Sequence, residues 1–200
     1  MAIIAKTGGQ DFVKAPAGTH AARCYQVIDL GTQKGEYKGK PTYKHKVLIV
    51  FELVDELMED GRPFSVSGKY TLSLSPKGNL RPLLESWRGV PFSEANAEGF
   101  DIENLLGKPC ILTAVHNVVG DRTYVNIASI SKPMKGMEVK PAVNPLVAFS
   151  LETDLDKLQN LPEWVQKIIG QSVEMNKGHE AHEESENPSP KDFNDDIPFN

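Results

Sequence analysis

The feature that most constrains the fold is an apolar face with a period of two within residues 43–54. Every second position from residue 47 is apolar, as Val47, Ile49, Phe51 and Leu53. The opposite positions include Lys44, Lys46 and Glu52. Because successive side chains of a β-strand point to opposite faces, a period of two predicts a strand with one apolar face. Residues 64–74 repeat the pattern, with an apolar face of Val66, Tyr70, Leu72 and Leu74.

A single helical stripe interrupts these strands. Within 75–89 the apolar residues recur at i, i+3, i+4 and i+7, as Leu80, Leu83, Leu84 and Trp87. This spacing places them on one face of a helix. The helix has two possible starts, at Ser75 with Pro76 in its first position, or near Asn79, which would place Pro82 in its first turn; it is expected to stop at Gly89.

The order of the predicted elements indicates a fold class. Strands are expected over 18–30, 43–54, 64–74, 108–119 and 122–131. Residues 31–42, rich in Gly, form a loop or a hairpin arm between the first two strands. Three strands, a helix and two more strands are the order of a mainly β, five-stranded OB-fold barrel with a helix between strands 3 and 4. This order excludes the alternating βα units of a parallel α/β fold.

The chain changes character after residue 132. Residues 132–145 carry three prolines and no periodic pattern of apolar residues, so they are expected to be extended. Apolar residues within 152–170 have helical spacing. We expect this helix to pack on the barrel or on a second subunit of a homo-oligomer. The polar, acidic residues from 171 onward are expected to be disordered. The sequence therefore predicts three parts. Residues 1–132 form a barrel, residues 133–170 form an extended linker with a C-terminal helix, and residues 171–200 form an acidic tail.

Charge is distributed unevenly along the chain. Residues 1–140 hold 18 Lys and Arg against 15 Asp and Glu, whereas residues 141–200 hold 4 against 12. A basic body with an acidic end indicates nucleic-acid binding or an interaction tail. The sequence shows neither a membrane-spanning run nor a signal peptide, and its two cysteines fit buried thiols, so we expect a cytoplasmic protein.

The most basic segment lies between the first two strands. Residues 34–46 interleave lysines with tyrosines, as Lys34, Tyr37, Lys38, Lys40, Tyr43, Lys44 and Lys46. Lysines neutralise phosphates and aromatic rings stack on unpaired bases, so the combination predicts binding of single-stranded DNA. In an OB-fold this segment borders the oligonucleotide site, which Lys69, Thr71 and Arg122 would extend. The alternative is a solvated, lysine-rich hairpin that serves solubility.

Other constellations point less strongly to a function. Lys77, Arg81 and Arg88 fit either solvated helix charges or contacts to DNA phosphates, and Trp87 fits the core. A zinc site would need the set His20, Cys24, Cys110 and His116, which lacks the usual spacing of zinc ligands. No sequence motif of an enzyme is present, and no cofactor is expected. A nuclease would have to use Asp55, Glu56 and Glu59, which fit a solvated turn better.

The segment "DFNDDIPF" over 192–199 joins acids to an apolar end. It resembles the C-terminal tip of bacterial single-stranded DNA-binding proteins, although Asn194 replaces an acid and Asn200 follows the phenylalanine. The matching residues are Asp192, Phe193, Asp195, Asp196, Ile197, Pro198 and Phe199. The resemblance implies that the tip binds replication, recombination and repair proteins. The negative charge of the tip further predicts that the tip competes with DNA for the lysine-rich segment of residues 34–46.

The body resembles phage-encoded single-stranded DNA-binding proteins in 18–33, 70–89 and 99–116. The resemblance implies a protein that coats single-stranded DNA in a bacterial host cell during phage replication or recombination. Two alternatives remain: a protein-interaction adaptor or decoy that mimics the host tail, and a nuclease. RNA is a further candidate ligand, because stacking and phosphate contacts do not read the 2′-hydroxyl.

Overall fold

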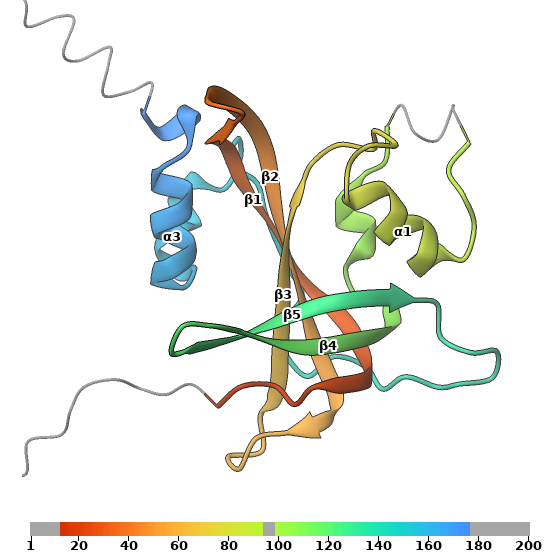
Figure 1. The fold of residues 1–200 in the computed structure, drawn as a ribbon. Helices are drawn as coiled ribbons and strands as arrows, with labels where there is room; N and C mark the ends of the chain where they lie inside the picture. The colour runs from red at the N-terminus through yellow and green to blue at the C-terminus, as the bar shows by residue number, and fades with distance from the viewer. Residues whose placement is uncertain (1–12, 94–98, 177–200) are drawn as a thin grey trace, which may run out of the picture.

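The computed structural model describes residues 13–93 and 99–176, and the acidic tip of residues 192–200 lies outside them. The fold is mainly β (Figure 1). Its strands are β1 (Gly18–Tyr37), β2 (Lys40–Leu57), β3 (Pro63–Thr71), β4 (Pro109–Val119), β5 (Arg122–Ser131) and β6 (Val147–Phe149). Its helices are α1 (Leu80–Arg88), η1 (Ile102–Leu105), η2 (Leu155–Asn160) and α3 (Glu163–Gly170).

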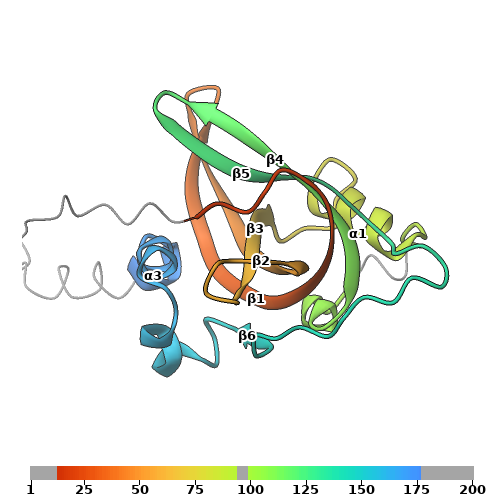
Figure 2. The same ribbon diagram turned by 90° about the horizontal axis from the view of Figure 1, so that it is seen from below.

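The strands form one curved sheet in the order β3-β2-β1-β4-β5, and neighbours along this path are antiparallel. β6, which the sequence did not predict, pairs with β1 in parallel. Figure 2 shows how far the sheet curves. β3 and β5 come into contact, yet no hydrogen-bonded ladder joins them among the described residues. The sheet is therefore open, and the closed five-stranded barrel is not observed.

The segment 31–42 is a hairpin arm rather than a loop. β1 and β2 stay paired along it as far as Tyr37 and Lys40. Lys38 and Gly39 form the turn with φ angles of 52° and 75°. Two successive positive φ angles are typical of the type I′ turn, whose twist matches that of the two strands it joins.

The main core lies inside the curved sheet and confirms the predicted apolar face of residues 47–53 and the predicted helical stripe of residues 80–87. Val47, Ile49, Phe51 and Leu53 are all buried there. α1 covers one opening of the sheet with Leu80, Leu84 and Trp87. Its N-cap is Asn79, the later of the two predicted starts. Leu72, predicted to face inward, is 41% exposed because β3 ends one residue before it.

The opposite face of β2 is also buried, because the C-terminal segment packs on it. Leu48 and Val50 form a second apolar layer with Val165 and Ile169 of α3. The helix predicted over 152–170 is divided into η2 and α3, and its support is the sheet of the same chain. Glu52, on the same face of β2, is completely buried.

The buried Glu52 carboxylate ties the linker to the sheet. It accepts hydrogen bonds from the backbone N–H of Val143 at 2.6 Å and of Asn144 at 2.9 Å, and from the Asn144 side chain at 2.6 Å. From β1, the Arg23 guanidinium donates to the carbonyls of Gly107, Val139 and Lys140. Within the described ranges no helix is long and apolar enough to cross a membrane.

Candidate nucleic-acid interface

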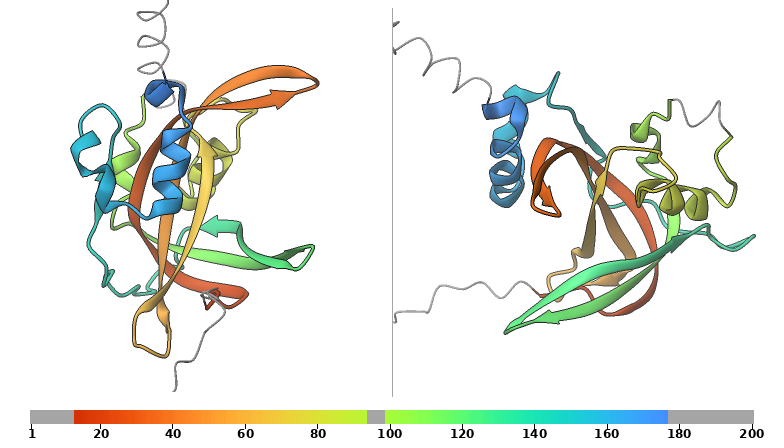
Figure 3. Two further views of the ribbon diagram at one scale, coloured as in Figure 1. Left: turned by 90° about the vertical axis from the view of Figure 1, so that its left-hand side faces the viewer. Right: turned by 45° about the horizontal axis from the view of Figure 1, so that its top comes forward.

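Two β-hairpin arms frame one side of the molecule. In the left view of Figure 3 the β1–β2 arm and the β4–β5 arm project in the same direction, with β3 between them and α3 beside β3. The arms extend because each hairpin remains paired to its turn, at Tyr37–Lys40 and at Val119–Arg122. We call the surface between them, where residues of β2, β3, β5 and α3 line one cavity, the groove.

Strand register decides which residues of the β1–β2 arm face the groove. Along β2, Lys40, Lys44 and Lys46 share a face with Leu48, which lines a cavity of about 380 Å³ at the bottom of the groove. Tyr37 pairs with Lys40 and lies on this face. Lys46 and Leu48 pair with Thr71 and Lys69 of β3, so these two residues continue the same surface. The groove face therefore carries Tyr37, Lys40, Lys44, Lys46, Lys69 and Thr71.

The same register places two predicted residues on the other face of the arm. Tyr43 pairs with Lys34, and both lie on the positions that alternate with the groove face. Tyr37 and Tyr43 are comparably exposed, at 64% and 57%, so exposure alone does not separate them. Lys38 lies in the turn, with its Nζ 5.4 Å from the centroid of the Tyr37 ring.

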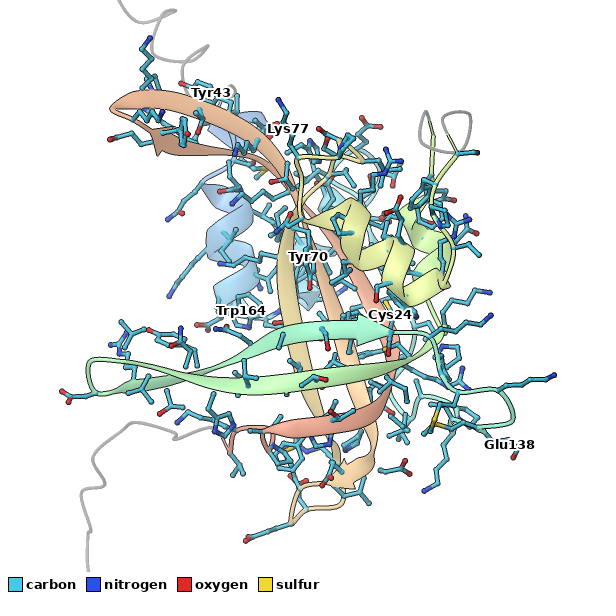
Figure 4. All side chains as sticks on the ribbon, turned by 45° about the vertical axis from the view of Figure 1, so that its right-hand side comes forward. Cys24, Tyr43, Tyr70, Lys77, Glu138 and Trp164 are labelled. Carbon is cyan, nitrogen blue, oxygen red and sulfur yellow. The ribbon has the colours of Figure 1, made fainter. Side chains whose placement is uncertain are left out.

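Trp164 of α3 lies at the bottom of the groove, where sequence analysis placed no functional residue. It lines the cavity together with Lys69, Asn126 and others, and 47% of its surface is exposed. Figure 4 shows Trp164 at the end of α3 that faces the β4–β5 arm. An exposed indole beside a lysine offers an aromatic face next to a cation, the combination that binds an unpaired base and its phosphate.

The β4–β5 arm supplies the opposite wall. Asn126 lines the cavity. Tyr124 and Arg122 lie two and four residues before it in β5, so they share its face of the strand. Tyr124 is 47% exposed. The predicted Arg122 thus lies at the tip of this arm, on the face that carries Asn126. Alternation within "RTYVN" was a signal that could have identified Tyr124 from the sequence.

The C-terminal segment also braces the base of the β1–β2 arm. Glu174 accepts hydrogen bonds from the backbone N–H of Thr32 at 2.8 Å and from its hydroxyl at 2.6 Å. Burial opposes ionisation of Glu174, but these hydrogen bonds outweigh it and hold the pKa of the carboxyl below its usual range. Gly31, at φ 70°, allows this approach, because a Cβ there would lie 2.7 Å from Ser172.

Asp29 adds a second contact at this base, where its carboxylate lies 2.6 Å from Nε2 of His45. The base of the arm therefore carries two carboxylates, Asp29 and Glu174. Of the groove-face lysines, Lys46 pairs with Gly31 at this base, whereas Lys40 and Lys44 lie farther along the arm and Lys69 lies on β3.

The four residues considered for zinc do not form a metal site. His20 contacts the carbonyl of Pro16 and His116 that of Ala15, each through Nε2. Cys24 and Cys110 are buried thiols, and burial raises the pKa of Cys24 to about 12 and that of Cys110 further. No cluster of three or more metal-ligating side chains occurs in residues 13–93 and 99–176.

Two of the three acids considered for a nuclease are paired with other groups. The Asp55 carboxylate lies 2.8 Å from Nζ of Lys140, and Glu56 lies 3.4 Å from Nδ1 of His20. Glu59 lies in the turn after β2. Arg81 donates to Glu85 at 2.9 Å and to the Phe92 carbonyl, and Arg88 lies over the Phe92 ring, so these two residues are not the solvated helix charges that were predicted.

No family model matches the chain, and no curated protein matches it.

Proposed function

We propose that the protein binds single-stranded DNA in the groove without strong sequence preference. The observation that carries this proposal is the gathering of cations and aromatic rings from three parts of the chain on one surface. The β1–β2 arm contributes Tyr37 and Lys44, β3 contributes Lys69, and the β4–β5 arm contributes Tyr124. Phosphates would contact the lysines, while bases stack on the exposed rings.

We further propose that the fold is an open OB-fold of the kind found in phage-encoded single-stranded DNA-binding proteins. The order β3-β2-β1-β4-β5, with α1 between β3 and β4, supports this assignment. The contact between β3 and β5 supports it as well, because these strands approach each other where an OB barrel closes. In OB-folds the loops between strands 1 and 2 and between strands 4 and 5 border the oligonucleotide. Both arms of the groove occupy these positions.

The acidic tip completes the proposal. Asp195, Asp196, Ile197, Pro198 and Phe199 would recruit replication or recombination proteins through charge and apolar contact. Coating of the DNA and recruitment of partners would then be separate tasks of the sheet and the tail, in the cytoplasm of a bacterial host.

The deciding experiment is a titration of labelled oligo-dT by fluorescence anisotropy at several salt concentrations. A duplex and an oligo-rU of equal length are titrated in parallel. The expected result is salt-sensitive binding with a clear preference for oligo-dT. Equal affinity for the duplex would refute the proposal and reduce the groove to a general polyanion surface, while a preference for oligo-rU would make RNA the ligand.

Tryptophan fluorescence offers a second readout of the same binding. The chain has two tryptophans, of which Trp87 is buried and donates through Nε1 to the Pro109 carbonyl at 2.8 Å. Trp164 is exposed in the groove, so oligo-dT should quench its emission by stacking. The variant Trp164→Phe should retain the emission of Trp87 and lose the quenching. Quenching that persists in this variant would exclude contact between Trp164 and DNA.

A further inference from the structure

A second cavity of about 380 Å³ lies beside α1, and none of its lining residues lines the cavity of the groove. Its apolar surface comes from Trp87, Phe100, Leu105, Pro109 and Pro133. The Nε1–H of Trp87 is already donated to the Pro109 carbonyl, so the indole presents only carbon to the cavity. This surface suits an apolar or aromatic side chain.

Three cations surround this apolar surface. Arg88, Lys108 and Lys132 line the cavity, and both lysines are exposed. The lining contains no carboxylate among the residues that the structure describes. A ligand that combines negative charge with an apolar side chain would therefore match both parts of the cavity.

Arg88 is a second reason to expect an acidic ligand in this cavity. Its guanidinium lies 4.3 Å from the centroid of the Phe92 ring and 5.9 Å from that of Phe100. The Nη1 atom is buried and has no hydrogen-bond partner within the described part of the chain. A buried N–H without an acceptor is costly, and a carboxylate is the acceptor that a guanidinium binds most strongly.

We propose that this cavity binds the tip of this chain, residues 192–200. Phe199, with Ile197 or Pro198, would occupy the apolar surface, and Asp195 and Asp196 would pair with the surrounding cations. Residues 177–191 separate the tip from the last described residue and can span up to about 50 Å when extended, which permits binding within one molecule or between two. This inference concerns a separate surface and does not rest on DNA binding.

The cavity fits the tip better than the groove does, although the sequence predicts competition between tip and DNA. The cavity at the bottom of the groove has a single cation in its lining, Lys69, together with polar residues such as Ser67 and Asn126. The cavity beside α1 combines an apolar surface with three cations and no carboxylate among its described lining residues. Tip and DNA would then bind at the same time, so that a coated strand would not by itself release the tip.

The test measures binding of a fluorescein-labelled peptide of residues 192–200 to the full chain by anisotropy. The acceptor chain carries D195N, D196N and F199A, so that its own tip no longer competes. We expect it to bind the peptide at least about tenfold more tightly than the unmodified chain, because a tethered tip acts at roughly millimolar concentration. Adding K108Q and K132Q should weaken binding about tenfold, since two of three cations are lost.

The matched control is K135Q, which removes an exposed lysine of the same segment outside the cavity and should change binding less than about twofold. Both cavity lysines are exposed, so the double variant should fold normally. Equal binding by the double variant and the K135Q control would overturn the proposal. A larger loss with K44Q and K69Q, together with displacement of the peptide by oligo-dT, would place the tip in the groove instead. Oligo-dT affinity, measured in parallel, reports separately on the proposed function.

Discussion

The two tyrosines of the β1–β2 arm allow the groove to be tested with a matched pair of substitutions. Tyr37 and Tyr43 belong to one hairpin and have similar exposure, but they lie on opposite faces. Stacking of a base on an aromatic ring contributes about 1–3 kcal/mol. Because Lys38 lies 5.4 Å from the centroid of the Tyr37 ring, one face of that ring is partly covered and a single base can stack on the other. We therefore expect Tyr37→Ala to cost about 1–2 kcal/mol of binding free energy, or about 5- to 30-fold in affinity for oligo-dT.

Tyr43→Ala is the control, and it should change the affinity less than about twofold, because Tyr43 lies on the face away from the groove. Both side chains are exposed, so neither substitution should alter the free energy of unfolding by more than about 0.5 kcal/mol. Anisotropy titrations at one salt concentration, with circular dichroism to verify the fold, make the comparison. An equal or greater loss for Tyr43→Ala would refute the assignment of the groove face.

Three further predictions follow from the contacts described above. Lys44→Gln and Lys69→Gln should each reduce by about 0.7 the slope of log K against log salt concentration for oligo-dT binding, because each removes one phosphate contact. Lys34→Gln, on the other face, should leave this slope unchanged. Equal slopes for all three variants would contradict the assignment of the groove face. Glu52→Ala should lower the free energy of unfolding in urea by about 3 kcal/mol, because it leaves buried N–H groups without acceptors, and a loss below about 0.5 kcal/mol would show that the linker adapts freely. Burial raises the pKa of Cys24 from its ordinary 9.0 to about 12, so its native thiol should resist alkylation at pH 8 and react once unfolded. Because only the unfolded thiol ionises above about pH 9, the free energy of unfolding should fall as the pH rises from 9 towards 12, and a rise would contradict this linkage.

The local pattern of the chain was sufficient to predict the strands and the helix. Alternation at Val47, Ile49 and Phe51 identified β2, and the spacing from Leu80 to Trp87 identified α1, because these periods follow directly from backbone geometry. The helix start at Asn79 also followed from local chemistry, through the restriction that Pro82 imposes. Element type is a property of a short segment, and it can be inferred from that segment alone.

The candidate site was predicted only in part. The sequence identified the arm and its lysines, but the separation of Tyr37 from Tyr43 depends on the pairing of β1 with β2, and one residue of slip would reverse it. Trp164 falls within the helix predicted over 152–170, but nothing near it in sequence shows that α3 begins beside Lys69 and Asn126.

The two faces of β2 show what the sequence determines and what the tertiary structure determines. The sequence by itself determined that Val47 and Glu52 lie on opposite faces, because alternation is a local consequence of the extended backbone. Only the tertiary structure decided that both faces are buried, since the apolar layer of α3 and the N–H groups of Val143 and Asn144 come from segments about 100 residues away. The sequence likewise determined the charge and the rings of the arm, while the curvature of the sheet decided which of them meet. Burial and proximity depend on which distant segments pack together, and that information is distributed over the whole chain.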